Sequence, residues 1–87
     1  MIDEIIQHII DSGFCLVYAY EPILSQNVHR FIIKRRYGER EFNHSWMLSD
    51  EEFRSMHKGV LLMIMDRHME EINNAITQHR LIEEALS

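Results

Sequence analysis

The chain begins with isoleucines at helical spacing. Apolar residues recur every three or four positions, with polar residues between them: Ile2, Ile5, Ile6, Ile9 and Ile10. This spacing gathers the isoleucines on one face of a helix. Gly13 follows the last of them, and glycine readily adopts the left-handed conformation that ends many helices. The pattern predicts a short amphipathic helix over residues 2–12.

Three strands are predicted after this helix. Residues 14–20 are rich in aromatic and branched side chains and run into Pro22, which cannot donate to a ladder, so residues 21–27 are expected to form a loop. Residues 28–37 and 40–48 flank Gly38, which can supply the positive φ of a tight hairpin turn. The sequence therefore predicts a three-stranded antiparallel meander.

The hairpin turn sets the register of its two strands. If Gly38 and Glu39 occupy the turn, Phe31 pairs with Trp46 and every other pair follows. One face then carries an aromatic and apolar set: Phe31, Ile33, Arg35, Phe42, His44 and Trp46. The opposite face is basic and polar, with Arg30, Ile32, Lys34, Arg36, Glu41, Asn43, Ser45 and Met47. The aromatic face is expected to be the buried one.

A long helix is predicted at the C-terminal end. Ser49 and Glu52 have the spacing of a capping box, and the acids that follow the serine suit the positive end of a helix. An unbroken helix to Leu86 would outrun the sheet, so we expect a break near Gly59 or Asn73, or an overhang. The expected fold is α+β: one domain over residues 1–87, with an N-terminal helix, the meander and this helix.

This C-terminal helix carries two apolar stripes. The first we assign to the aromatic face of the sheet: Phe53, Met56, Val60, Met63 and Ile64. The second follows a heptad spacing that predicts a self-association seam: Leu61, Met65, His68, Ile72, Ala75, His79, Ile82 and Leu86. The hypothesis is a homodimer through this seam. The alternative is that the chain folds back at a break and buries both stripes within one molecule.

Charge is distributed unevenly along the 87 residues. The net charge is −5, but residues 28–48 carry five bases and two acids between two acidic segments. The one cysteine, Cys15, lies in an apolar run, which suggests a buried thiol in a reducing compartment. Apolar runs fall far short of the ~20 residues of a membrane span, and the N-terminal residues are acidic, so a cytoplasmic protein without membrane contact is expected.

The sequence contains no arrangement that predicts catalysis. Its three glycines are too scattered for a phosphate loop, and no serine or carboxylate pair carries a catalytic signature. His68 and Glu71 have the spacing of a metal-ligand pair but lack a second pair. His57, His68 and His79 lie 11 residues apart, nearly in line on a helix, where they could set register or sense pH. We expect no catalytic residue, no metal and no cofactor.

A basic hairpin is the predicted contact surface. It consists of Arg30, Lys34, Arg35, Arg36, Tyr37 and Arg40. The order helix, three strands, helix resembles the double-stranded RNA-binding domain, whose second helix begins with lysines; here that place reads Ser49-Asp50-Glu51-Glu52, which repels phosphates. Nucleic acid is therefore the alternative ligand, and a protein partner is preferred.

In size, acidity and plan, the chain resembles the small phage-encoded inhibitors of bacterial defence, including anti-CRISPR proteins. That resemblance implies a non-enzymatic protein that occupies a surface of a host protein or ribonucleoprotein complex in the host-cell cytoplasm, often as a dimer. Two other functions stay open: a nucleic-acid-associated accessory protein that binds through residues 30–40, and a purely structural oligomer.

Overall fold

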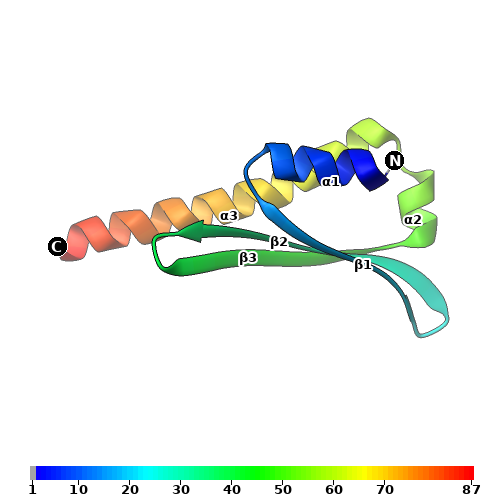
Figure 1. The fold of residues 1–87 in the computed structure, drawn as a ribbon, viewed down its shortest axis with the longest axis horizontal. Coiled ribbons are helices and arrows are strands. Elements are labelled where there is room, and N and C mark those ends of the chain that lie inside the picture. Colours follow the sequence, from blue (N-terminus) through cyan, green and yellow to red (C-terminus); the bar gives the residue numbers. More distant parts are fainter. Residues whose placement is uncertain (1) are drawn as a thin grey trace.

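A computed structural model describes residues 2–87, which form one antiparallel sheet and three helices (Figure 1). The elements in chain order are α1 (Ile2–Asp11), β1 (Cys15–Ile23), β2 (Gln26–Tyr37), β3 (Arg40–Ser49), α2 (Asp50–Ser55) and α3 (Lys58–Leu86). The strand order is β1-β2-β3. Helices α1 and α3 lie together on one side of the sheet, and the other side is uncovered. The predicted α+β fold is confirmed.

Helix α1 ends as its sequence predicts. Gly13 has φ +91°, and its N–H donates to the carbonyl of Ile10 while the N–H of Phe14 donates to the carbonyl of Ile9. These two bonds are a Schellman cap, which satisfies carbonyls that the helix end leaves free. Ile5 and Ile9 are fully buried, so the isoleucine face packs into the core.

The β2–β3 hairpin has the predicted register. Phe31 pairs with Trp46, and Tyr37 pairs with Arg40 to close the turn. Gly38 has φ +62° at the first central position, which is where a two-residue turn of type II′ places glycine. The parity of every pair in this hairpin follows from that one glycine.

The loop predicted at residues 21–27 is wrong. Strand β1 continues to Ile23, β2 begins at Gln26, and Pro22 pairs with Asn27 inside the ladder. Because β1 is an edge strand, it can hold a proline that a central strand would exclude. Leu24 turns the chain with φ +50°, and its side chain is 94% exposed.

The long C-terminal helix is interrupted near Gly59, one of the two expected places. Met56 and His57 are extended, and His57 caps α3 by accepting a hydrogen bond from the N–H of Gly59 at 3.0 Å. The helix then continues through Asn73 without a break. This interruption turns the chain back, so that α3 crosses the sheet beside α1 (Figure 1).

The core lies between the sheet and this helical layer. Phe31 is fully buried and stacks on Trp46 at 5.1 Å between ring centroids. From α3 the buried residues are Leu61, Met65, Met69 and Ile72. The expectation that Val60 and Met63 pack on the sheet is wrong, because they are 46% and 66% exposed. The seam stripe packs there instead, since the break sets the rotation of α3 independently of α2.

The structure also bears on the expected membrane contact and on Cys15. No helix within residues 2–87 is long and apolar enough to cross a membrane. Cys15 is exposed, so the prediction of a buried thiol is wrong. Its register partner is Lys34, and the alternation of the strand points both side chains to the uncovered side of the sheet.

The capping box of α2 provides a first stability prediction. The Ser49 hydroxyl accepts from the N–H of Glu52 at 3.1 Å, and the Glu52 carboxylate accepts from the N–H of Ser49 at 3.3 Å. Ser49→Ala is expected to lower the free energy of unfolding by about 1 kcal/mol, because it leaves a helix-end amide without its partner. Urea unfolding followed by circular dichroism measures the loss. Ser55→Ala, at the other end of the same helix, is the control, and an equal loss there would contradict a role of the cap.

Candidate protein-binding surface

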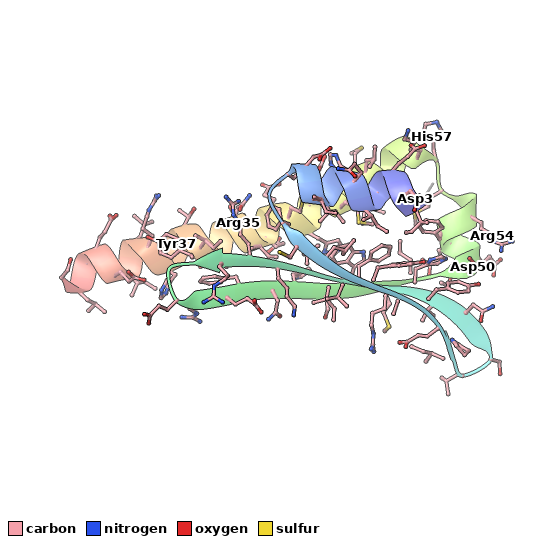
Figure 2. All side chains as sticks on the ribbon, in the orientation of Figure 1. Asp3, Arg35, Tyr37, Asp50, Arg54 and His57 are labelled. Atoms are coloured by element: carbon pink, nitrogen blue, oxygen red, sulfur yellow. The ribbon has the colours of Figure 1, made fainter. Side chains whose placement is uncertain are left out.

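One side of the sheet carries no helical layer (Figure 1). We call it the open sheet face. By the register of the three strands it consists of Cys15, Val17, Ala19 and Glu21 from β1, Val28, Arg30, Ile32, Lys34 and Arg36 from β2, and Glu41, Asn43, Ser45 and Met47 from β3. Figure 2 shows side chains projecting from this side of the sheet into open space.

An apolar band crosses the middle of the open sheet face. Val17 pairs with Ile32, and Ile32 pairs with Ser45; Met47 lies two residues beyond Ser45 on the same face of β3. Val17 and Met47 are 48% and 53% exposed, and Ile32 is half-buried between them. A shallow hollow of about 200 Å³ beside Ile32 and Met47 marks the end of the band. Contiguous exposed apolar side chains with a charged border are typical of a protein interface.

Cations border this band along the central strand. Arg30 of β2 lies 3.4 Å from Glu21 of β1, and Lys34 of β2 lies 3.9 Å from Glu41 of β3. Each cation is thus paired with a carboxylate on a neighbouring strand. Exposed pairs of this kind contribute little to stability, so their charges stay available to a partner. Arg36 donates to the backbone carbonyl of Glu39 at 3.5 Å.

The predicted basic hairpin is divided between the two sides of the sheet. Arg30, Lys34 and Arg36 lie on the open sheet face, as their parity predicts. Arg35 instead donates to Asn73 of α3 at 2.7 Å and covers the ring of Phe14. In Figure 2 the labelled Arg35 and Tyr37 lie on the α3 side of the hairpin.

Tyr37 and Arg40 help to hold α3 on the end of the hairpin. Tyr37 meets the ring of His79 edge-on at 6.1 Å, and Arg40 lies over Phe42 at 5.0 Å. Arg40 also reaches His79 Nδ1 at 3.4 Å, and His79 pairs with Glu83. Between the turn and α3 these residues leave an open hollow of about 500 Å³, which we call the hairpin hollow.

The predicted self-association seam is largely consumed within the molecule. Leu61, Met65 and Ile72 are at most 2% exposed, so the prediction that they meet a partner helix is wrong. Helical periodicity identifies an apolar side but not what covers it, and here the chain's own sheet and α1 do. His68, Ala75 and His79 are partly buried under the same cover. Only Ile82 and Leu86, at 58% and 84% exposure, remain accessible.

The three aligned histidines have separate structural roles. His57 caps α3, His68 stacks on Trp46 at 4.0 Å, and His79 packs on Phe42 at 5.6 Å. Burial lowers the pKa of His68, and the nearby His44 lowers it further. Within residues 2–87 no group of three potential ligands is placed to hold a metal ion.

A polar relay under the sheet escaped the sequence analysis. His29 of β2 is 6% exposed; its Nδ1 lies 2.7 Å from the Tyr18 hydroxyl and its Nε2 lies 2.9 Å from Asp50 Oδ1. The hydrogen bond from His29 lowers the pKa of Asp50, with help from Arg54. Burial raises the pKa of Tyr18. Since an ionised carboxylate only accepts, His29 Nε2 must donate, and Tyr18 then donates to Nδ1. Strand parity was the available signal, because it places His29 on the aromatic face.

Comparison with known proteins adds no relative to this description: no family model, no curated protein and no solved structure matches the chain. The exposed apolar band and the bordering cations of the open sheet face are features of a surface that binds a partner without covalent chemistry.

Proposed function

We propose that the protein is a non-enzymatic protein-binding module that holds its partner on the open sheet face. The observation that carries this proposal is the band formed by the exposed Val17 and Met47 and the half-buried Ile32, on a sheet that has helices on its other side only. Burying such a band removes apolar surface from water, which is the main driving force of protein association.

The bordering charges specify the chemistry of the partner. Arg30, Lys34 and Arg36 run along the central strand, so a partner with an apolar strip flanked by carboxylates complements the face. A second copy of the same face does not, because packing two such faces together brings the cations of one central strand against those of the other. The proposed partner is therefore a different protein with an acidic border around an apolar strip.

Inhibition of a host defence complex is the use that we propose for this surface. The size and plan of the chain resemble phage-encoded inhibitors, whose action is to occupy a surface of a host protein or ribonucleoprotein in the host-cell cytoplasm. An open sheet face suits occupancy, since it needs neither a cavity nor a reactive group.

Nucleic-acid binding through the hairpin is the second candidate. It is supported by the cations at residues 30–40. Opposing it, the open sheet face, which lies wholly within the described residues, has no aromatic side chain on which bases could stack. The acidic residues at the start of α2 add repulsion.

A pair of methionine variants tests the proposal. Met47→Asp places a carboxylate in the apolar band and is expected to weaken partner binding by at least about tenfold. Met63→Asp is the matched control, because Met63 is also exposed but lies on α3, on the other side of the molecule. Capture from host lysate, quantified by mass spectrometry, should show proteins retained by wild type and Met63→Asp and lost by Met47→Asp.

Equal capture by both variants would contradict the open sheet face as the binding surface. A gel shift with labelled DNA and RNA distinguishes the second candidate. If the wild type shifts nucleic acid and Arg30→Glu with Lys34→Glu abolishes the shift, the nucleic-acid function replaces the proposed one. The shift should also weaken as salt is raised, as phosphate contacts require.

A further inference from the structure

Strand β1 has an unpaired outer edge. Within residues 2–87 it pairs only with β2, because the strand order is β1-β2-β3. Helix α1 packs on β1, while α3 packs on β2 and β3, so β1 and α1 form one side of the molecule. In Figure 1 this side faces the viewer, with β1 crossing in front of the other strands and α1 in front of α3. The outward backbone groups of β1 need a hydrogen-bonding partner, either water or another strand.

The turn that ends β1 shows which of its backbone groups point outward. Ile23 and Gln26 flank a two-residue turn and form a hydrogen-bonded pair. Bonded pairs alternate with unbonded ones along an antiparallel ladder, so every second residue before Ile23 also bonds to β2. The residues between them direct their N–H and C=O groups away from β2: Leu16, Tyr18 and Tyr20.

This edge lacks the features that usually keep edge strands from pairing with another chain. Charges and prolines give that protection, yet residues 15–20 carry neither. Glu21 and Pro22 follow directly after them. The opposite edge of the sheet is different, because β3 carries Glu41 and a hollow of about 230 Å³ beside it is lined by Glu71 of α3. Of the two edges, β1 is therefore the one suited to pairing.

Two exposed apolar side chains lie on the same side of the molecule as this edge. Ile10 of α1 is 51% exposed, and Tyr20 of β1 is 49% exposed. Ile10 lies about 200° around the helix from His8, which contacts α3, so Ile10 points away from α3. The bond from the N–H of Gly13 to its carbonyl holds Ile10 beside the start of β1. Tyr20 lies toward the other end of β1, on the helical side of the sheet.

We propose that a second copy of this chain adds its β1 to this edge, antiparallel, around a two-fold axis at Tyr18. Tyr18 then pairs with its equivalent, and Leu16 pairs with Tyr20 of the second copy, so that every outward N–H of these residues meets a C=O. A register shifted toward Pro22 loses bonds, because proline has no N–H. A register shifted toward Phe14 loses them too, because the N–H of Phe14 already bonds to α1.

The same axis brings the two exposed side chains together. Tyr20 of the second copy lies beside Leu16, near the start of β1, and Ile10 lies over this end of the strand. Ile10 therefore packs on the ring of Tyr20 of the second copy, and the contact occurs twice in the dimer. A strand of another protein would satisfy the backbone but not this second contact. The occupant that fits both features is a second copy.

No like charges meet along the ladder. Residues 16–20 carry no charge, and Glu21 falls opposite Cys15 of the second copy. Arg30 and Lys34 of β2 are separated from the β2 of the second copy by three strand spacings, at least about 14 Å, which exceeds the Debye length of about 8 Å at physiological salt. Pairing at the edge thus avoids the repulsion that opposes packing of two open sheet faces.

The size of the contact sets the expected strength of the dimer. A ladder of five residues is about 17 Å long, and with its side chains it buries roughly 500 Å² per copy. That is near the lower limit for a specific interface, so we expect a dissociation constant of roughly 1–100 µM. The dimer leaves the open sheet face free and does not depend on the proposed function.

Sedimentation equilibrium tests the dimer. Wild type, from about 1 µM to about 500 µM, should pass from monomer toward dimer. Ile10→Asp should raise the dissociation constant by at least about tenfold, because it places a carboxylate against Tyr20 of the second copy. Leu81→Asp is the matched control: Leu81 is 53% exposed but lies on α3, and the constant should change by less than about twofold. Circular dichroism checks that both variants keep the fold.

Amide hydrogen exchange followed by NMR tests the register. Between about 50 µM and about 1 mM protein, the amides of Leu16, Tyr18 and Tyr20 should slow by about threefold or more, because they are bonded only in the dimer. Asn43 and Ser45, whose amides point outward from β3 by the same alternation, are the control and should not change.

A wild type that stays monomeric throughout this range overturns the proposal and leaves the edge to water or to another protein. So does a dimer that Ile10→Asp does not weaken, or that Leu81→Asp weakens equally. Slowed exchange at Asn43 and Ser45 in place of the β1 amides would place the contact on the wrong edge and would overturn it as well.

Discussion

Replacing Phe31 with alanine is expected to remove a large share of the protein's free energy of unfolding. Phe31 is fully buried at the centre of β2, stacked on Trp46 at 5.1 Å and tilted against Tyr18 at 5.2 Å. Truncating a buried phenylalanine costs about 3–5 kcal/mol, from the lost transfer free energy and the cavity left behind. Domains of this size have a total stability of roughly 5–10 kcal/mol, so this one substitution removes about a third or more of it.

Chemical unfolding in urea, followed by far-ultraviolet circular dichroism, measures this loss. Val17→Ala is the control, since Val17 lies in the neighbouring strand but points to the open sheet face; its loss should stay within about 0.5 kcal/mol. If Phe31→Ala lost less than about 1 kcal/mol, the core would not be centred where the structure places it.

The β2–β3 hairpin could be predicted pair by pair because its determinants are local. Gly38 fixes the turn, and the two-residue period of a strand then places Phe31 opposite Trp46 and assigns each side chain to a face. The helix caps at Gly13 and Ser49 were predictable for the same reason. In each case the residues that decide the structure are neighbours in the sequence.

The wrong predictions concern how distant elements pack against one another. The apolar side of α3 was identified correctly, yet its cover was assigned to another molecule, because periodicity carries no information about distant segments. Leu61 and Met65 are instead buried by the chain's own sheet and α1. A proline in the sequence predicts the end of a strand, and only the strand order shows that Pro22 lies in an edge strand, which tolerates it. The exposure of Cys15 and the burial of His29 likewise follow only once it is known which face of β1 and β2 the helices cover.

The candidate surface likewise contains residues that local sequence could place and residues that it could not. Parity alone placed Arg30, Lys34 and Arg36 on one face, which the register confirms. The contacts of Arg35 with Asn73 and of Arg40 with His79 join residues 38 and 39 positions apart, and they could not be anticipated. These long-range contacts hold α3 on the hairpin, and so they determine where the helix leaves the sheet and becomes exposed.

The His29 relay is expected to make the stability of the protein depend on acid. Asp50 has a folded pKa below its ordinary value of 3.8, first because His29 donates to it and then because Arg54 lies 2.9 Å away. A carboxyl with a lowered pKa binds its proton more weakly in the folded state than in the unfolded state. Its contribution is therefore fully present above the unfolded pKa and is lost as the pH falls through the folded pKa.

Asp50→Asn should remove this part of the acid dependence. Wild type is expected to lose stability as the pH falls below about 4, and the variant should show a shallower fall together with lower stability at pH 7. Glu51→Gln is the matched control, because Glu51 shares the first turn of α2 and its dipole but makes no bond to the relay. Urea unfolding at a series of pH values between 7 and about 2 yields both curves.

Replacing His29 itself should have a larger effect at neutral pH. His29→Ala leaves the Tyr18 hydroxyl and the Asp50 carboxylate without their partner and removes a ring that stacks on Phe53 at 4.1 Å. The expected loss is about 1–3 kcal/mol, from the cavity left by a ring that is 6% exposed and from the lost stacking on Phe53. If the relay acts as one unit, Asp50→Asn in the His29→Ala background should cost much less than Asp50→Asn alone. Additive losses would instead mean that Asp50 stabilises α2 through Arg54 and the helix dipole, and that His29 stabilises the sheet separately.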